Sequence, residues 1–510
     1  VFKRHDINPS IWVTRSVSTR TTLPLFALSP IKLLPMKNAT ELLGSINNIY
    51  GYVLMALLAI AGLYFSIRTV VVQIRHLPEM MRTLLEQPEK HEGGKKGISA
   101  FRSFTVSAAS RVGTGNIVGV AVAIALGGPG ALFWMWLFAI VGGATAFVES
   151  TLGQLYKVKD KATGAFRGGP AYYIEKGLEK RWLAILFVIA ITFTYGFVFN
   201  MVQANSITET TSQALKPLIH NSDNMKWVNL ALALVISALT AAVIFGGIWR
   251  ISAVSQVLVP IMAVVYIVLG LYVCIVNGAK IPGAISLIFQ CAFGATQVAG
   301  AGIGAALMIG IRRGLCSNEA GMGSVPNASA TAAVSHPVKQ GFVQTLGVYF
   351  DTLIICSVTA FIILLNNPDY GVDDGAVATQ HALAHQLGSW ANPVLAVVLF
   401  FLAYSSIIGN YYYGECNIQF LTESKKALMW FRILVVLCVF GGSLAALDFV
   451  WALADISMSI MATINLVAVI PLGGLAIELL RDYNSQKDSG HNPVFHKDSL
   501  PQARNVECWD

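Results

Sequence analysis

Charged residues are scarce in this chain, and several common catalytic motifs are missing from it. Only 12% of the 510 residues are Asp, Glu, Lys or Arg, whereas soluble domains carry about 25%. The seven cysteines form no CxxC pair, so neither a disulfide framework nor a metal site is indicated. The sequence has no HExxH motif and no GxxxxGK[ST] motif. A zinc peptidase and an ATP-driven pump are therefore not indicated.

Apolar residues are abundant instead. They make up 55% of the chain, and the mean hydropathy is +0.62, which is typical of a polytopic membrane protein. The net charge of +8 would suggest nucleic-acid binding in a soluble protein. Here the basic residues lie in the loops between apolar segments, where the positive-inside rule explains them better. The expected surroundings are thus a lipid bilayer, with no nucleic-acid partner and no partner protein evident.

Eleven apolar segments are long enough to cross a bilayer, and they predict an all-α polytopic membrane protein of about eleven transmembrane helices. The segments cover residues 46–67, 101–126, 131–156, 182–202, 228–248, 252–275, 284–309, 341–365, 393–420, 429–446 and 449–472.

Lysine and arginine gather in alternate loops. They lie after the first, third, fifth, seventh and ninth segments and in the tail, whereas the loop after the eighth carries Asp369, Asp373 and Asp374. This predicts an external N-terminus and a cytoplasmic C-terminus in a plasma membrane, such as a bacterial inner membrane. Residues 68–96 mix apolar and basic side chains, which indicates an amphipathic interfacial helix.

The stretch from Arg111 to Gly119 interrupts the second segment with the sequence Arg-Val-Gly-Thr-Gly-Asn-Ile-Val-Gly. Each glycine weakens a helix by roughly 1 kcal/mol relative to alanine, and Thr114 and Asn116 place polar groups at membrane depth. Unwound backbone there offers carbonyls to a cation, and the following half-helix offers N–H groups to a carboxylate. The stretch therefore predicts half of a solute site. Close helix packing through small residues is the alternative.

A second interruption lies in the seventh segment, where residues 293–304 mix glycines with Thr296 and Gln297. Segments two to six and seven to eleven form two sets of five that run in opposite directions, and each set opens with an interrupted helix. Corresponding broken helices are a strong sequence indication of a transporter site near the bilayer midplane. We predict an inverted five-plus-five repeat that is preceded by one extra N-terminal helix.

This organisation divides the chain into five parts. Residues 1–45 are a polar N-terminal extension, in which Met36 is the expected start of the protein and a targeting peptide in residues 1–35 is the alternative. The parts that follow are the first transmembrane helix with the amphipathic cytoplasmic segment (46–100), the first repeat (101–283), the second repeat (284–474) and a polar cytoplasmic tail (475–510).

Other polar residues lie within the segments. Asn200 and Gln203 end the fourth, and Ser405 and Ser406 are adjacent in the ninth. Two hydroxyls and the carbonyls of the first interruption would make a weak, reversible sodium site. For each side chain alone, a hydrogen bond to a neighbouring helix, at about 0.6 kcal/mol on average, is an equally good explanation.

Four acidic residues lie near or within segments, namely Glu149, Asp351, Glu415 and Asp455. Intramembrane carboxylates are candidates for function. Most of these four lie close to the ends of segments, where an ion pair with a cytoplasmic arginine or lysine would suffice. We therefore assign none of them to the site.

Several long motifs resemble the alanine or glycine:cation symporter family. They are Arg-Val-Gly-Thr-Gly-Asn-Ile (111–117), Gly-Gly-Pro-Gly-Ala-Leu-Phe-Trp-Met-Trp (127–136), Arg-Gly-Gly-Pro-Ala-Tyr-Tyr (167–173), Ser-Asn-Glu-Ala-Gly-Met-Gly-Ser (317–324) and Gly-Asn-Tyr-Tyr-Tyr-Gly-Glu (409–415). The resemblance runs from about residue 47 to 474. It implies the leucine-transporter-type fold and sodium-coupled uptake of small neutral amino acids by alternating access.

The resemblance also implies binding residues and no catalytic ones. It places Gly113, Ser405 and Ser406 around sodium, which is transported and is not a prosthetic group. Around the substrate it places Thr114, Gly115, Asn116, Gln203, Phe293, Gly294 and Ala295.

One position departs from the family pattern. Asn410 stands where typical alanine carriers of the family have tryptophan. Asparagine leaves more space than an indole and adds a hydrogen-bond donor and an acceptor. We therefore expect an enlarged pocket that prefers glutamine to alanine or glycine.

Three alternatives stay open at this point. A proton-coupled transporter of the same fold is the first, because the sequence alone does not identify the coupling ion. A polytopic intramembrane hydrolase is the second, although no carboxylate pair or Ser/His dyad is evident. A channel is the third alternative. Selectivity filters are usually built from repeated polar loops or rings of charged residues, whereas this sequence has two single broken helices.

Overall fold

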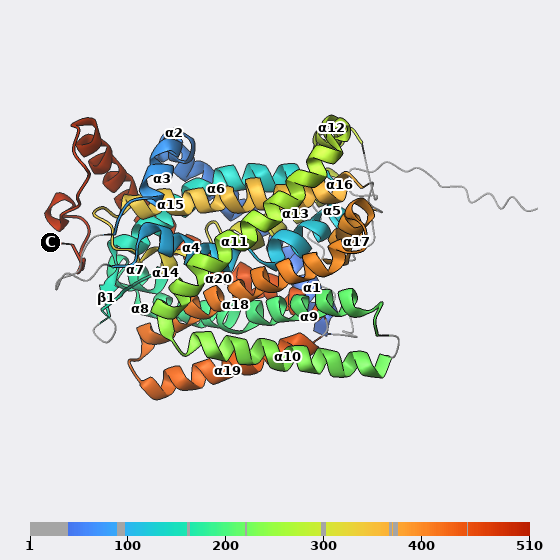
Figure 1. Cartoon of the computed structure of the whole chain (residues 1–510). Coiled ribbons are helices and arrows are strands. Elements are labelled where there is room, and N and C mark those ends of the chain that lie inside the picture. Colours follow the sequence, from blue (N-terminus) through green and yellow to red (C-terminus); the bar gives the residue numbers. More distant parts are fainter. Residues whose placement is uncertain are drawn as a thin grey trace, which may run out of the picture.

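The computed structural model describes residues 39–88, 97–160, 164–219, 222–296, 302–366, 370, 376–445 and 447–509. These residues are almost entirely helical (Figure 1). The predicted start at Met36 lies outside the described residues.

Nine helices in the described part of the chain are long and apolar enough to cross a membrane, and a bent pair makes a tenth. The tenth consists of α4 (Ala100–Arg111), η1 (Gly115–Gly119) and α5 (Val120–Gly127), with a bend of 54°. The nine lie in α1 (Ala39–Arg68), α6 (Gly130–Leu155), α8–η2–α9 (Arg181–Ile191, Thr192–Val198, Phe199–Leu215), α10 (Ser222–Ile244), α11 (Gly247–Val276), α15–η4–α16 (Val338–Tyr349, Phe350–Cys356, Ser357–Leu364), α18 (Ala391–Leu421), α19 (Lys425–Leu444) and α20 (Leu447–Asp488).

The seventh predicted segment, 284–309, is two helices rather than one. α12 (Ile281–Ala292) ends at Phe293, and α13 (Ile303–Asn318) runs well beyond the predicted end. Hydropathy joined the two because the glycine-rich run between them is itself apolar. α13 and the short α14 (Val325–Ser329) complete the set of about eleven predicted helices, so the fold class is confirmed. The inverted repeat stays a prediction.

Small elements join the long helices. They are α2 (Val72–Arg75), α3 (Leu77–Leu84), β1 (Val158–Lys159), β2 (Phe166–Arg167), α7 (Pro170–Gly177), η3 (Gly278–Lys280), α17 (Ala376–Leu387) and η5 (Lys497–Ser499). β1 and β2 pair antiparallel, with Val158 opposite Arg167. α3 lies in the predicted amphipathic segment and buries Met80 and Leu84 on the side that contacts α15.

The long helices pack against one another in several groups. α6 contacts both α13 and α15, and α9 contacts both α18 and α19. α10 and α19 lie side by side along one edge of the molecule, and α1 packs against α20 (Figure 1). These contacts bring α4, η1, α9, α13, η4 and α18 together in the interior.

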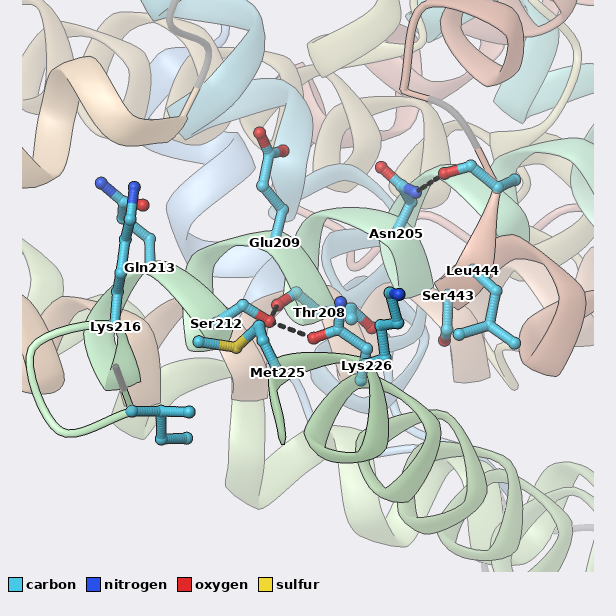
Figure 2. Close-up of a pocket in the computed structure, with 13 residues that line it drawn as sticks. Asn205, Thr208, Glu209, Ser212, Gln213, Lys216, Met225, Lys226, Ser443 and Leu444 are labelled. Atoms are coloured by element: carbon cyan, nitrogen blue, oxygen red, sulfur yellow. Dashed lines mark hydrogen bonds between the residues drawn. The ribbon is translucent and has the colours of Figure 1, made fainter. Parts of the chain in front are cut away.

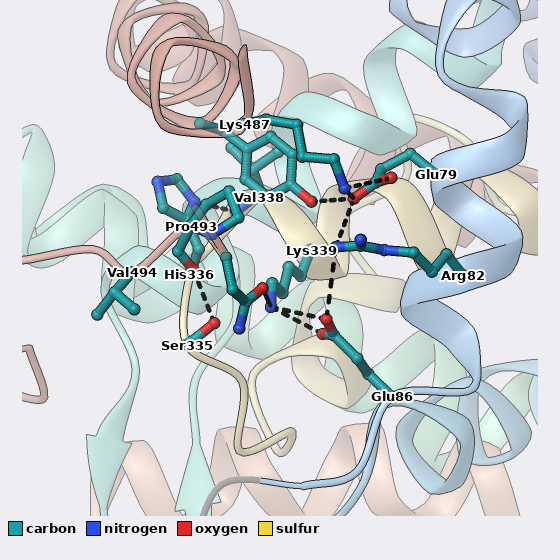
Figure 3. Close-up of polar contacts among 12 residues, drawn as sticks. Glu79, Arg82, Glu86, Ser335, His336, Val338, Lys339, Lys487, Pro493 and Val494 are labelled. Carbon is teal, nitrogen blue, oxygen red and sulfur yellow. Dashed lines mark hydrogen bonds and ion pairs between the residues drawn. The ribbon is translucent and has the colours of Figure 1, made fainter. Parts of the chain in front are cut away.

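The end of the chain is not a free polar tail. α20 continues to Asp488, beyond the predicted boundary at 475. The residues that follow fold back, and the N–H of Phe495 donates to the carbonyl of Ser335 at 2.9 Å. The indole N–H of Trp509 donates to the carbonyls of Gln154 and Leu155 at 3.3 and 3.2 Å. An ion pair of Lys339 with Glu86 at 2.8 Å joins α15 to the loop after α3 beside this segment (Figure 3).

Candidate substrate and ion site

The first interruption lies where the sequence predicts it. α4 ends at Arg111, and Val112, with φ −80° and ψ 86°, leaves the helix. The side chain of Asn116 accepts a hydrogen bond from the N–H of Gly113 at 2.9 Å. Gln203 of α9 accepts one from the N–H of Thr114 at 3.1 Å. Side chains thus satisfy N–H groups that the unwound turn exposes, as burial at membrane depth requires.

α18 packs against the same turn. The hydroxyl of Ser406 lies 3.5 Å from the carbonyl oxygen of Val112 and 3.2 Å from that of Leu402. A Cβ at Gly113 would lie 2.2 Å from the Ser406 hydroxyl oxygen and 2.9 Å from the Gln203 amide oxygen. Only glycine therefore allows this close approach. Ser405 donates to the carbonyl of Leu402, in its own helix, at 2.7 Å.

Asn410 also reaches the first interruption. Its side-chain oxygen accepts a hydrogen bond from the hydroxyl of Ser110 at 2.6 Å. The approach is close because Gly409 meets the backbone of α4, where a Cβ would lie 2.7 Å from the N of Ser110. The amide nitrogen of Asn410 is buried and has no hydrogen-bond partner among the described residues. The same holds for the hydroxyl of Thr114.

The structure does not place residues 293–295 with the others. Phe293 is 59% exposed and packs its ring on those of Phe133 and Trp134, at 5.0 and 6.2 Å between centroids. Gly294, with φ +74°, lies against Ile303. Phe293, Gly294 and Ala295 follow the end of α12, on a surface of α6, and the prediction that they surround the substrate is wrong. The helix on which it depended ends before them.

The interruption that does reach the site is the turn from Glu319 to Ser324. Glu319 has a left-handed backbone with φ 58°, and Gly321 and Gly323 have φ 84° and 79°. Glu149 of α6 accepts hydrogen bonds from the N–H groups of both glycines at 3.1 Å. The sequence signal for this turn is the pair of glycines, Gly321 and Gly323, in the motif 317–324.

The two interrupted helices meet at Glu319. One carboxylate oxygen lies 2.8 Å from the hydroxyl oxygen of Ser110, and the other accepts a hydrogen bond from the hydroxyl of Ser324 at 2.7 Å. Ser110 therefore contacts both Glu319 and Asn410, so three elements far apart in the sequence converge at one hydroxyl. The side chains of Ser110, Glu319 and Asn410 thus form a polar cluster where α4, the end of α13 and α18 meet.

Two of the four acidic residues noted in the sequence form ion pairs. Glu415 lies 3.0 Å from Arg432, and Asp455 lies 2.6 Å from Arg313. Both contacts are ion pairs with an arginine, which is the structural role that the sequence suggested for these carboxylates. Glu149 instead holds the second turn, and Asp351 contacts Asn116, Ser317 and Thr352.

A separate cavity of about 860 Å³ lies between α9, α10 and the end of α19 (Figure 2). Asn205 borders it and donates to the carbonyls of Gly442 and Ala445 at 3.1 and 2.7 Å. Asn205 and Gln203 are two residues apart on a helix and so face nearly opposite sides. Because Gln203 faces Thr114, α9 separates this cavity from the first interruption.

Comparisons with known proteins agree with this architecture. The model of the sodium:alanine symporter family matches residues 36–497. The amino-acid carrier protein AlsT of Bacillus subtilis is 51% identical and covers 90% of this chain and 94% of its own. The probable sodium/glutamine symporter GlnT of the same organism is 46% identical, with 92% and 96% covered. The sodium/alanine symporter AgcS of Methanococcus maripaludis is 35% identical, with 87% and 97% covered.

A solved structure shows the fold. The crystal structure of MhsT in complex with L-phenylalanine matches with a TM-score of 0.54 at 14% identity, over 79% of this chain and 92% of that one. This likeness supports the leucine-transporter-type fold that the motifs implied. The full-length matches go further, because they cover nearly all of the membrane part at 35–51% identity. The chain belongs to the sodium:alanine symporter family.

Proposed function

We propose that this protein is a sodium-coupled symporter that imports small neutral amino acids across the plasma membrane by alternating access. The observation that carries the proposal is the first interruption, where buried backbone polar groups at Val112–Gly115 meet Gln203 and Ser406 in mid-span. The loop charges support an external N-terminus and a cytoplasmic C-terminus. The names of the relatives support sodium and an amino acid as the transported pair.

The substrate carboxylate fits the start of η1. Backbone N–H groups of Thr114, Gly115 and Asn116 lie at the positive end of the half-helix, where an anion is favoured. The hydroxyl of Thr114 is buried and adds a donor. The carboxylate would take the place of the Gln203 amide oxygen at the N–H of Thr114, and this frees Gln203 to contact the ammonium group.

Sodium fits between the interruption and α18. The carbonyl of Gly113 and the hydroxyls of Ser405 and Ser406 are the proposed ligands, and the Val112 carbonyl already lies beside Ser406. Neutral oxygens bind sodium weakly enough for release on the inside. Each sodium that enters at 100 mV supplies roughly 2.3 kcal/mol, which corresponds to about forty- to fifty-fold accumulation of the amino acid.

Asn410 is the proposed determinant of substrate size. Its amide replaces the indole of typical family members, and its nitrogen has no partner among the described residues. A substrate with a side-chain carbonyl can accept a hydrogen bond from that nitrogen. Glutamine meets both requirements, namely more space and a polar side-chain partner, so we propose that it is preferred to alanine and glycine.

Uptake of labelled glutamine and alanine into proteoliposomes tests the proposal. An inward sodium gradient should drive accumulation of at least one of them, with the larger rate for glutamine. A proton gradient that drives uptake in place of sodium would keep the fold and refute the Ser405 and Ser406 ion site. Absence of transport of any small amino acid by a monodisperse preparation would refute the function.

A further inference from the structure

The last part of the chain folds onto the protein. It consists of residues 489–509, which follow α20 and include η5, and we call it the C-terminal segment. Its side chains Phe495, Leu500 and Trp509 are buried, with exposed fractions of 2%, 5% and 6%. The loop charges place this end of the molecule in the cytoplasm. A cytoplasmic segment that buries three apolar side chains is docked by the hydrophobic effect.

The first half of the C-terminal segment binds the loop between α14 and α15. The hydroxyl of Ser335 donates a hydrogen bond to the carbonyl of Pro493 at 2.8 Å (Figure 3). The carbonyl of Ser335 accepts one from the N–H of Phe495 at 2.9 Å. The ring of Phe495 contacts that of His336, with 5.7 Å between centroids. Two hydrogen bonds and a ring contact thus fix the segment to this loop.

The second half of the segment binds α6 and α7. The indole of Trp509 donates to two carbonyls in the last turn of α6, at 3.3 and 3.2 Å. Glu507 forms an ion pair with Lys176 of α7 at 2.5 Å, and the side chain of Asn505 donates to the carbonyl of Lys176 at 3.1 Å. The rings of Trp509 and Phe495 lie 5.6 Å apart, which joins the two halves.

The loop that the segment binds also holds the start of α4. Ile98, just before α4, forms a bridge with Ala332, and its carbonyl accepts a hydrogen bond from the N–H of Ala333 at 2.9 Å. Within α4, the hydroxyl of Ser103 donates to the carbonyl of Ala328 in α14 at 2.9 Å. α4 is the half-helix that leads to the first interruption. Its position therefore depends on the loop to which the C-terminal segment is fixed.

Two groups of helices meet at the C-terminal segment. In the first group, α14 and α15 each contact both α4 and α6. In the second group, α20 contacts α7, α8 and α9. The segment continues from α20, binds the first group at Ser335 and at the end of α6, and reaches α7 at Lys176. Alternating access is largely the rocking of one such group against another, so a bridge between them on one side opposes opening on that side.

We propose that the C-terminal segment is a latch that holds the cytoplasmic gate closed, the gate being the contacts of α4 with α11 and α18. The docked segment favours the state in which α4 is packed, and release of the segment favours the state that is open to the cytoplasm. The coupling is reciprocal, so opening of the gate also weakens docking. This inference rests on the proposed function, since it concerns the same alternating-access cycle.

The burial of Thr105 in α4 gives a direct measure of the gate. Its exposed fraction is 0%, and its hydroxyl bonds only within α4, to the carbonyl of Arg102. In purified Thr105→Cys, the rate of maleimide labelling of that peptide, followed by mass spectrometry, reports how often α4 becomes accessible. Removal of residues 489–510 should raise this rate several-fold. Thr240→Cys in α10, equally buried and outside the gate, is the control position and should react at an unchanged rate.

A second variant covers the case in which the truncated chain does not fold. Phe495→Ala combined with Trp509→Ala removes both aromatic anchors and leaves α20 whole. Trypsin cleavage after Lys497 and Arg504 then measures release of the segment, and both cleavage and labelling at position 105 should become several-fold faster. Val494→Ala, at a 41% exposed valine of the same segment, is the matched control and should change neither rate.

The outcomes separate the latch from the proposed function. Faster cleavage of the segment with unchanged labelling at position 105 would refute the latch and make the segment a structural cover. Equal increases at positions 105 and 240 would mean a general loosening of the fold and would refute it too. Unchanged cleavage in the double variant would refute the docking on which the latch depends. Absence of sodium-driven uptake by the wild type, with labelling at 105 still controlled by the segment, would refute the proposed function and keep the latch.

Discussion

The side-chain oxygen of Asn410 accepts a hydrogen bond from the hydroxyl of Ser110 at 2.6 Å, and this contact joins α18 to the last turn of α4. Asn410 is fully buried, and Gly409 beside it permits the close approach of the two helices. The residue at position 410 therefore lies against the last turn of α4, next to the first interruption.

Asn410→Trp should shift the substrate preference toward alanine and glycine. An indole fills the space that the amide leaves, so a glutamine side chain no longer fits, whereas alanine and glycine still do. We expect the ratio of glutamine to alanine uptake to fall at least tenfold. Asn410→Ala, which removes the amide without adding bulk, should still transport glutamine but with a smaller preference over alanine, because the hydrogen bond from the amide nitrogen is lost. Equal relative uptake in Asn410→Trp and wild type would remove Asn410 from the determinants of size.

Gly113→Ala should abolish most transport. The new Cβ would lie 2.2 Å from the Ser406 hydroxyl oxygen and 2.9 Å from the Gln203 amide oxygen, so the turn or α18 must shift. Overpacking of this kind costs about 1–3 kcal/mol, and here it falls on the proposed ion ligands. Uptake should drop at least tenfold. Gly441→Ala is the matched control, since a Cβ there meets no heavy atom within 4 Å among the described residues.

Ser406→Ala should weaken the response to sodium. The hydroxyl of Ser406 lies beside the Val112 carbonyl, and its removal takes away one neutral ligand. We expect the half-saturating sodium concentration for uptake to rise about tenfold, or about 1.4 kcal/mol. Ser459→Ala removes a hydroxyl that bonds within α20, to the carbonyl of Asp455, and should leave the sodium response unchanged. A normal sodium response in Ser406→Ala would move the ion elsewhere.

The sequence predicted the first interruption because its cause is local. Glycines and polar side chains within seven residues, Gly113 to Gly119, disfavour a continuous helix wherever the chain places them. The sequence places the second interruption too early for the opposite reason. Residues 300–304 are apolar enough for hydropathy to include them in a membrane span. The break in the structure begins at Glu319, a charged residue that hydropathy excludes from a span.

Long-range contacts decide the rest of the site. The N–H groups of Gly321 and Gly323 are satisfied by Glu149, a residue more than 170 positions away. The contact of Ser110 with Asn410 spans 300 positions. A single sequence identifies the polar residues that need hydrogen-bond partners when buried, but it does not identify which residues pair with each other. The partners of Glu149 and Asp351 therefore follow from the packing of the helices and not from the sequence around each residue.

The His336–Asp482 pair makes stability depend on pH. Burial lowers the pKa of His336 from the ordinary value of 6.5, and the hydrogen bond to Asp482 opposes this shift. Because the N–H of Val338 donates to Nδ1 of His336 at 3.2 Å, the neutral ring carries its proton on Nε2, which lies 3.1 Å from a carboxylate oxygen of Asp482. A histidine with a lowered folded pKa stabilises the fold above its unfolded pKa and loses that contribution as the pH falls.

We therefore expect the melting temperature to fall as the pH is lowered from about 7.5 through the unfolded pKa of 6.5 and below it. His336→Gln keeps a donor and an acceptor without a titrating ring, and its melting temperature should fall less over the same range. Melting curves in detergent at several pH values measure this difference. His381→Gln, at a histidine in α17, is the control and should keep the wild-type slope. Parallel curves for wild type and His336→Gln would contradict the expected linkage.

Lys157 and Trp509 should hold the last segment of the chain in place. The ammonium group of Lys157 lies 4.1 Å from the centroid of the Trp509 ring and 4.2 Å from that of Phe166. A cation held over two aromatic faces in a buried setting gains about 1–2 kcal/mol per contact. The indole also donates to the end of α6, so Trp509→Ala removes both kinds of contact.

Residues 489–509 of the Trp509→Ala variant should be cleaved by trypsin several-fold faster than in the wild type. Trp509→Phe, which keeps an aromatic face but no donor, should give an intermediate rate. Cleavage of Trp509→Ala at the wild-type rate would mean that the contacts around Ser335 alone secure the segment.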